Sequence, residues 1–140
     1  MGFLIDTGIW IDVERGAVAP ADVASITGAE PVYLSPVTLA ELKFGAEIAS
    51  APELRHKRLA ALQRLQRKPT LRIDADTGII FGALASELRR AGRGAASHRT
   101  QDVWIASQAI QHGLKLLTRN EKDFLDIPGL DLAAWPSKRR

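Results

Sequence analysis

Short apolar runs alternate along this chain with longer segments whose apolar residues have helical spacing, and this alternation restricts the fold more than any other feature. The first run, Gly2–Ile5, contains no polar side chain and is followed directly by Asp6. Apolar runs of this kind are typical of strands that are buried on both faces of a parallel sheet. The sequence therefore predicts an α/β domain with a mostly parallel sheet and helices on both of its faces.

The same signals predict the other elements. Strands are predicted at Val32–Leu34, Leu71–Ile73 and Lys115–Leu117, with a short edge strand at Asp131–Trp135. Helices are predicted from Thr7 to Gly16, at Ala21–Ile26, at Val37–Ile48 after the N-cap Ser35, from Pro52 to Pro69, after Asp74 or Asp76, and at Gln101–His112 with Thr100 as N-cap. The segment Arg89–Arg99 is predicted to be a loop, and Asn120–Phe124 a short helical turn.

Length and composition exclude several classes of protein. The 140 residues, 46% apolar and 25% charged, predict one globular domain over residues 1–140. The absence of cysteine excludes disulfides, thiolate metal sites and cysteine nucleophiles. No apolar run approaches the roughly 20 residues that a membrane span needs. The N-terminus has no basic region and carries Asp6 early, so we expect no signal peptide and a cytoplasmic protein without a membrane partner.

Basic residues gather in two segments of the chain. The sequence has 19 Lys and Arg residues against 16 Asp and Glu residues, a net charge of +3. The basic clusters suit a polyanionic substrate, although each is equally compatible with a solvated helix face. The candidates for contacts with such a substrate are Arg55, Arg64, Arg67 and Lys68 in the segment 53–72, and Arg93 and Arg99 in the segment 89–99.

Three acids occur in apolar surroundings. Asp6 follows a buried run, Glu41 lies within Leu39–Leu42, and Asp102 precedes an apolar helical stretch. Carboxylates beside buried segments cost free energy unless they are paired, hydrogen-bonded or bound to a cation. Several converging carboxylates repel one another unless a divalent cation neutralises them, and oxygen ligands select Mg²⁺ or Mn²⁺. Such ions support phosphoryl chemistry.

Each acid also has a purely structural explanation. Asp6 could cap the helix that follows it. Glu41 and Asp102 lie near predicted helix starts, where a negative charge interacts favourably with the helix dipole. Asp123 with Asn120 has the spacing of a capping-box variant. These structural explanations account for each acid alone better than they account for all four acids in one chain.

Four sequence blocks carry a resemblance to a known family. They are FLIDTGIWID, LSPVTLAELKFGA, DVWIASQAIQHGLKLLTRNEKDF and LDLAAW. In order and spacing they resemble PIN-domain ribonucleases, and within that family the VapC type, which is the toxin of toxin–antitoxin pairs. The resemblance implies a three-layer α/β/α fold with a parallel sheet and RNA cleavage that depends on Mg²⁺ or Mn²⁺.

The resemblance also implies roles for single residues. Asp6 and Asp102 match the principal metal ligands, Glu41 matches an assisting acid, and Thr7 matches a hydroxyl that orients the site. The fourth acid of many relatives stands in a T-x-D-x-x-F arrangement, and Asn120 occupies that position here. Relatives with Asn at that position keep an acid just before the Phe, which here is Asp123. The resemblance therefore favours Asp123 as the fourth catalytic carboxylate, and Asn120 as an orienting residue that could hydrogen-bond a metal-bound water or the phosphate.

The partners follow from the same resemblance. It implies an RNA substrate such as tRNA or mRNA, a cognate antitoxin protein, and a homodimer. Two alternatives stay open: a non-catalytic RNA- or partner-binding module with a degenerate metal site, favoured by Asn120 and by Gly8 where a larger polar residue is common, and a DNA flap nuclease of the same fold.

Overall fold

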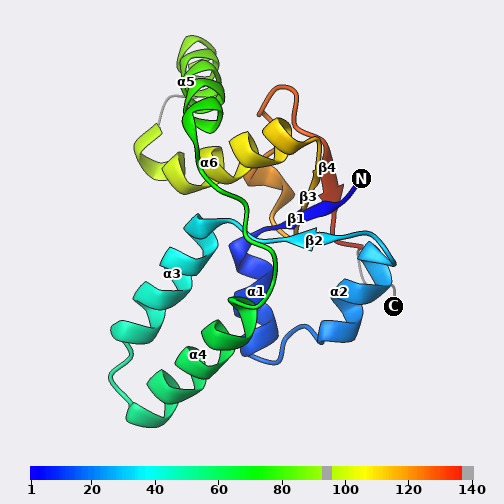
Figure 1. Cartoon of the computed structure of the whole chain (residues 1–140). Coiled ribbons are helices and arrows are strands. Elements are labelled where there is room, and N and C mark those ends of the chain that lie inside the picture. Colours follow the sequence, from blue (N-terminus) through cyan, green and yellow to red (C-terminus); the bar gives the residue numbers. More distant parts are fainter. Residues whose placement is uncertain (93–95, 137–140) are drawn as a thin grey trace.

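A four-stranded parallel sheet organises the chain. The structure is a computed structural model that describes residues 1–92 and 96–136, with no side chains described for residues 96–99 (Figure 1). The sheet has the order β2-β1-β3-β4, and every strand pair is parallel. Its strands are β1 (Phe3–Ile5), β2 (Val32–Tyr33), β3 (Lys115–Thr118) and β4 (Leu132–Ala134). The predicted α/β class with a parallel sheet is confirmed.

Helices cover both faces of this sheet. In Figure 1, α5 and α6 lie on one side of the sheet and α1 to α4 on the other, which confirms the three-layer arrangement. The helices are α1 (Thr7–Glu14), α2 (Pro20–Thr27), α3 (Pro36–Glu47), α4 (Pro52–Leu65), α5 (Ala75–Arg90) and α6 (Ala96–His112), and a short 3₁₀ turn, η1, spans Glu121–Asp123. None of the helices in the described part of the chain is both long and apolar enough to cross a membrane.

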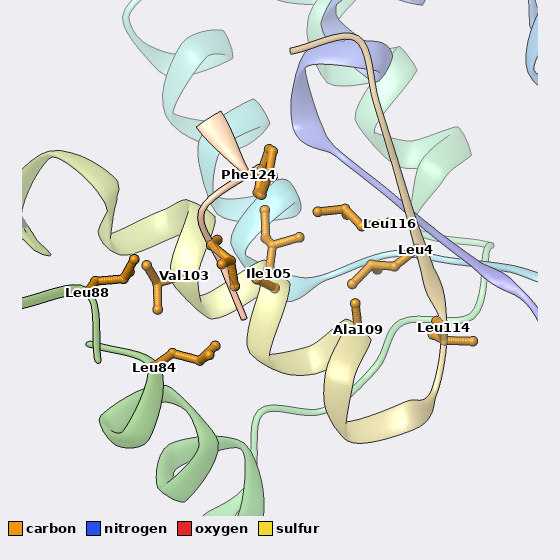
Figure 2. Packing of buried hydrophobic residues seen from close by; sticks show 11 residues of the cluster. Leu4, Leu84, Leu88, Val103, Ile105, Ala109, Leu114, Leu116 and Phe124 are labelled. Atoms are coloured by element: carbon orange, nitrogen blue, oxygen red, sulfur yellow. The ribbon is translucent and has the colours of Figure 1, made fainter. Parts of the chain in front are cut away.

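Strand alternation divides the core into two layers. Leu4 of β1 and Leu116 of β3 are register partners, and both pack in the cluster formed with α5 and α6 (Figure 2). Phe3 and Ile5 point to the opposite face, because successive strand residues alternate, and they pack with α1 and α2. The strand β1 is thus buried on both sides, which explains why its sequence is an uninterrupted apolar run.

The prediction of a strand at Leu71–Ile73 is wrong. Only an isolated bridge joins Leu34 to Thr70 before this segment. The buried side-chain amide of Gln108 donates hydrogen bonds to the carbonyls of Leu71 (3.1 Å) and Arg72 (3.3 Å). A side chain from α6 therefore satisfies backbone acceptors that a neighbouring strand would otherwise satisfy.

The predicted loop at Arg89–Arg99 is also wrong at both ends. The helix α5 continues to Arg90, and α6 begins at Ala96. Arg89 and Arg90 lie in the last turn of α5, where positive charge interacts favourably with the helix dipole. Thr100 lies inside α6 rather than at its N-cap.

Candidate active site

The sheet topology places Asp6 at a position where α/β proteins commonly bind ligands. Asp6 directly follows β1, which lies between β2 and β3 in the sheet. The next strand in the chain, β2, pairs with one edge of β1, and the later strand β3 pairs with its other edge. Such a reversal of strand order opens a crevice outside the carboxyl ends of the strands. The first acid of the predicted site therefore lies at the switch point of the sheet.

The side chain of Asp6 does not cap α1. Asp6 occupies the N-cap position, with φ −65° and ψ 146°, yet makes no side-chain cap hydrogen bond with the described residues of the helix. Its Oδ2 instead accepts a hydrogen bond of 2.9 Å from Thr118 Oγ1 at the end of β3. The backbone N–H of Asn120 donates to the same hydroxyl at 2.9 Å. This pairing across 112 residues favours the functional explanation of Asp6 over the capping one.

Burial raises the pKa of Asp6 above its ordinary value. The hydrogen bond from Thr118 and the adjacent Thr7 backbone N–H act in the opposite direction, and the negative charges of Glu41 and Asp123 raise the pKa further. The charged form of Asp6 is therefore disfavoured in the protein without a cation. Asp6 is thus within electrostatic reach of two of the other predicted acids at this edge of the sheet.

A chain of hydroxyls positions Glu41. Thr7 Oγ1 lies 2.7 Å from Glu41 Oε1 and 2.9 Å from the buried Thr38 Oγ1. A threonine hydroxyl has one proton, so Thr7 donates to Glu41 and accepts from Thr38. The start of α3 is fixed by the N-cap Ser35, whose side chain accepts from the Val37 N–H at 3.0 Å. The predicted orienting role of Thr7 thus has a specific contact, which is made to Glu41.

Asn120 and Asp123 lie at the turn η1. The side-chain amide of Asn120 donates to Asp123 Oδ2, and the Asp123 N–H donates to the Asn120 carbonyl at 3.1 Å. The amide therefore holds the carboxylate in place. Both side chains are exposed, so capping of the turn and a place at the acidic site are compatible with this geometry.

Asp102 lies on α6, which packs on the sheet through Val103 and Ile105. Because α6 begins at Ala96, Asp102 lies beyond the first helical turn, where the helix dipole stabilises a negative charge less. The structural explanation of Asp102 is therefore weaker than the sequence suggested. Its place among the acids rests on the sequence resemblance.

The acidic site offers only oxygen donors. Asp6, Glu41 and Asp123 supply carboxylates, and Thr118 supplies a hydroxyl. In residues 1–92 and 96–136, no group of three or more His, Cys, Asp or Glu side chains is placed so that it could hold a metal ion by itself. This donor set fits a hard cation such as Mg²⁺, whose shell retains several waters and needs only one or two protein carboxylates.

Thr118 is a residue of the site that sequence reasoning missed. It is fully buried at the carboxyl end of β3, beside the end of β1. A polar residue that ends an apolar strand is the same signal that singled out Asp6. The next residue, Arg119, forms an ion pair of 2.7 Å with Asp12 and lies 5.7 Å from the Trp135 ring, which ties this loop to α1 and β4.

The predicted phosphate-binding residues have different surroundings. Arg55 is exposed and forms an ion pair of 2.6 Å with Glu47. Arg64 and Lys68 line a groove of about 510 Å³ between α1, α2 and α4, and Lys68 Nζ lies 5.7 Å from the centre of the Trp10 ring. Arg67 is exposed just after the end of α4. Arg93 and the side chain of Arg99 lie outside the described residues.

The sequence and the fold of this chain are both similar to those of known proteins. The family model described as PIN domain matches residues 3–130. Ribonuclease VapC1 of Rickettsia felis is 33% identical over 139 residues, which is 99% of each chain. The tRNA(fMet)-specific endonuclease VapC of Salmonella typhimurium is 34% identical over 103 residues, 73% of this chain and 74% of that one. The DNA-bound VapBC structure from Salmonella typhimurium matches with a TM-score of 0.82 and 28% identity, covering 97% of this chain and 99% of that chain.

Proposed function

This chain belongs to the PIN-domain family and is a VapC-type ribonuclease toxin, and from that premise we propose that it hydrolyses RNA with a divalent cation held beside β1. The observation that carries the proposal is the partly buried Asp6 at the switch point of the sheet, within electrostatic reach of Glu41 and Asp123. Its raised pKa indicates a carboxylate whose charged form a nearby cation would stabilise.

Each residue of the acidic site has a distinct proposed role. Asp6 and Asp102 would hold the cation, which is Mg²⁺ or Mn²⁺, and Glu41 and Asp123 would add negative charge around it. Thr118 orients Asp6, Thr7 orients Glu41, and Asn120 orients Asp123. A bound cation would activate water and stabilise negative charge on the phosphate that is cleaved.

The substrate is a single-stranded or loop segment of RNA, such as a tRNA loop or an mRNA. Unstacked nucleotides can bend into an open acidic site more easily than a duplex can. The relative named as a tRNA(fMet)-specific endonuclease supports a tRNA substrate. Exposed basic residues on α4 would contact the flanking phosphates, which positions the RNA without selecting its sequence.

The direct test is cleavage of a labelled tRNA and a matching DNA oligonucleotide during titration with Mg²⁺ or Mn²⁺. We expect cleavage of RNA alone, loss of cleavage with EDTA, and recovery when either ion is added. Binding of RNA without cleavage at any metal concentration would identify a non-catalytic module. Cleavage of the DNA alone would identify a DNA nuclease.

We further propose that the groove between α1, α2 and α4 receives the antitoxin. Solved relatives of this fold include toxin–antitoxin complexes. The groove has apolar walls that include Val13, Val23 and Leu65, and basic residues that include Arg64 and Lys68. An amphipathic segment with acidic residues beside its apolar face would complement both features.

Neutralising Arg64, Arg67 and Lys68 together is expected to weaken RNA binding and its dependence on salt. Each bound phosphate releases counterions, so the slope of log affinity against log salt should flatten by about one unit for each phosphate that the variant no longer binds. The measurement is RNA binding from low to high salt by the wild type and the triple Gln variant. An unchanged slope, with loss of antitoxin binding, would assign these residues to the groove alone.

A further inference from the structure

A second pocket adjoins the acidic site. It lies between α1, α3 and α4 and has a volume of about 140 Å³. Glu41 lines this pocket and also accepts the hydrogen bond from Thr7, so it belongs to both the pocket and the acidic site. A ligand group in the pocket would therefore lie next to the reacting phosphate.

The volume is that of one six-membered ring. An engineered protein cavity of about 150 Å³ binds benzene. The walls of this pocket include the apolar side chains of Trp10, Leu42 and Leu62. A pyrimidine matches this space, whereas the two fused rings of a purine exceed it.

Polar groups in the pocket match the edge of a base. Glu14 Oε1 accepts from Arg58 Nε at 3.0 Å, and the side chains of this pair are only 14% and 26% exposed. Arg58 also donates to the Gly45 carbonyl at 3.0 Å. A carboxylate and a guanidinium held together in this way offer an acceptor and donors, which a pyrimidine edge needs.

Trp10 supplies an independent observation. It lines the pocket and is only 8% exposed, yet its indole N–H has no hydrogen-bond acceptor among the described residues. Buried donors of this kind are rare because leaving one unpaired carries a desolvation penalty. The nitrogen has almost no accessible surface here, so a ligand acceptor in the pocket would pair with it only after a small shift of the indole ring.

We propose that this pocket binds one pyrimidine base of the RNA, beside the phosphodiester that is cut. The proposal rests on the ribonuclease function proposed above. It makes Trp10, Glu14 and Arg58 residues that determine base preference, while the acids at β1 act on the phosphate.

The test uses a substitution at Gly45 that places a larger side chain in the pocket. A Cβ added at Gly45 meets no atom within 4 Å, and Gly45 lines the pocket. In Gly45→Leu the new side chain begins in open space at the pocket wall, and we expect it to take up the space of the base. Gly82→Leu is the matched control, since Gly82 is an exposed helical glycine on α5 with equally open surroundings.

The substrates are RNA oligonucleotides in which each nucleotide around the mapped cut is replaced in turn by an abasic one. In the wild type and in Gly82→Leu, removal of one pyrimidine next to the cut should slow single-turnover cleavage by about 5- to 150-fold, the range expected when one base interaction is removed. Gly45→Leu should cleave the intact RNA more slowly by a similar factor and respond little to the same abasic substitution.

A readout without cleavage completes the test. Cytidine and uridine monophosphates should quench tryptophan fluorescence of the wild type and of Gly82→Leu, but not of Gly45→Leu, and guanosine monophosphate should have a smaller effect. Equal sensitivity of Gly45→Leu and the wild type to every abasic substitution would show that the pocket does not bind a base. That result would not contradict the proposed ribonuclease function. A wild type that does not cleave RNA would overturn the function itself.

Discussion

The Asp6→Asn variant is expected to lose more than about 100-fold in RNA cleavage and to keep its fold. Removal of residues that only support metal ligands costs about 10- to 100-fold, and removal of a ligand carboxylate should exceed that range. Asn is the same size and can still accept the hydrogen bond from Thr118. The measurement is the single-turnover cleavage rate at saturating Mg²⁺, and the same loss is expected for Asp102→Asn.

The same variant should change how stability depends on pH in the metal-free protein. The pKa of Asp6 is raised in the folded state, so the folded protein holds this proton more tightly than the unfolded chain does. The contribution of Asp6 to the free energy of unfolding is therefore fully present below the ordinary Asp pKa of about 4. This contribution is lost as the pH rises through the raised pKa of the folded state. Asp6→Asn lacks this loss, and above that range its melting temperature in EDTA should equal or exceed that of the wild type.

Asp131→Asn is the control for both measurements, because Asp131 is an exposed acid beside β4. It should cleave and melt like the wild type. Wild-type cleavage rates in both Asp6→Asn and Asp102→Asn would show that the acidic site is wrongly assigned. A collapsed fold in Asp6→Asn would make Asp6 a structural residue.

The second large effect is expected at the turn η1. Asp123→Asn removes a negative charge that acts on Asp6, and the Mg²⁺ concentration for half-maximal cleavage should rise by at least about 10-fold. Titration of cleavage with Mg²⁺ gives this midpoint. If Asp123 only stabilises the turn, the melting temperature would fall and the Mg²⁺ midpoint would stay unchanged.

Asn120→Asp provides the opposite change at the same place. Its carboxylate would face Asp123, whose Oδ2 now accepts a hydrogen bond from the Asn120 amide. Repulsion between the two acids should lower the melting temperature without metal, and Mg²⁺ should restore more stability than it does in the wild type. The Mg²⁺ midpoint of cleavage should stay the same or fall. A higher midpoint would contradict a position of residue 120 near the cation.

The local pattern of the sequence was enough to predict the fold class, the strands on either side of the switch point and the helix start at Ser35–Pro36. Buried parallel strands have to be apolar on both faces, and a helix N-terminus needs a side-chain acceptor. Such requirements act over a few neighbouring residues, so they are visible in the chain itself. Asp6 was conspicuous for the same reason, since a carboxylate directly after a buried strand is costly unless it has a partner.

Features that depend on residues distant in the sequence were decided only by the tertiary structure. Leu71–Ile73 has the composition of a strand, yet Gln108 satisfies carbonyls in this segment from α6. Thr118 reaches Asp6 across 112 residues, and Thr7 reaches Glu41 across 34. The pocket at Gly45 exists only because three helices leave space there. Apolar periodicity records which side of an element is buried, whereas the pairing of polar groups depends on how whole elements pack, and no local pattern carries that information.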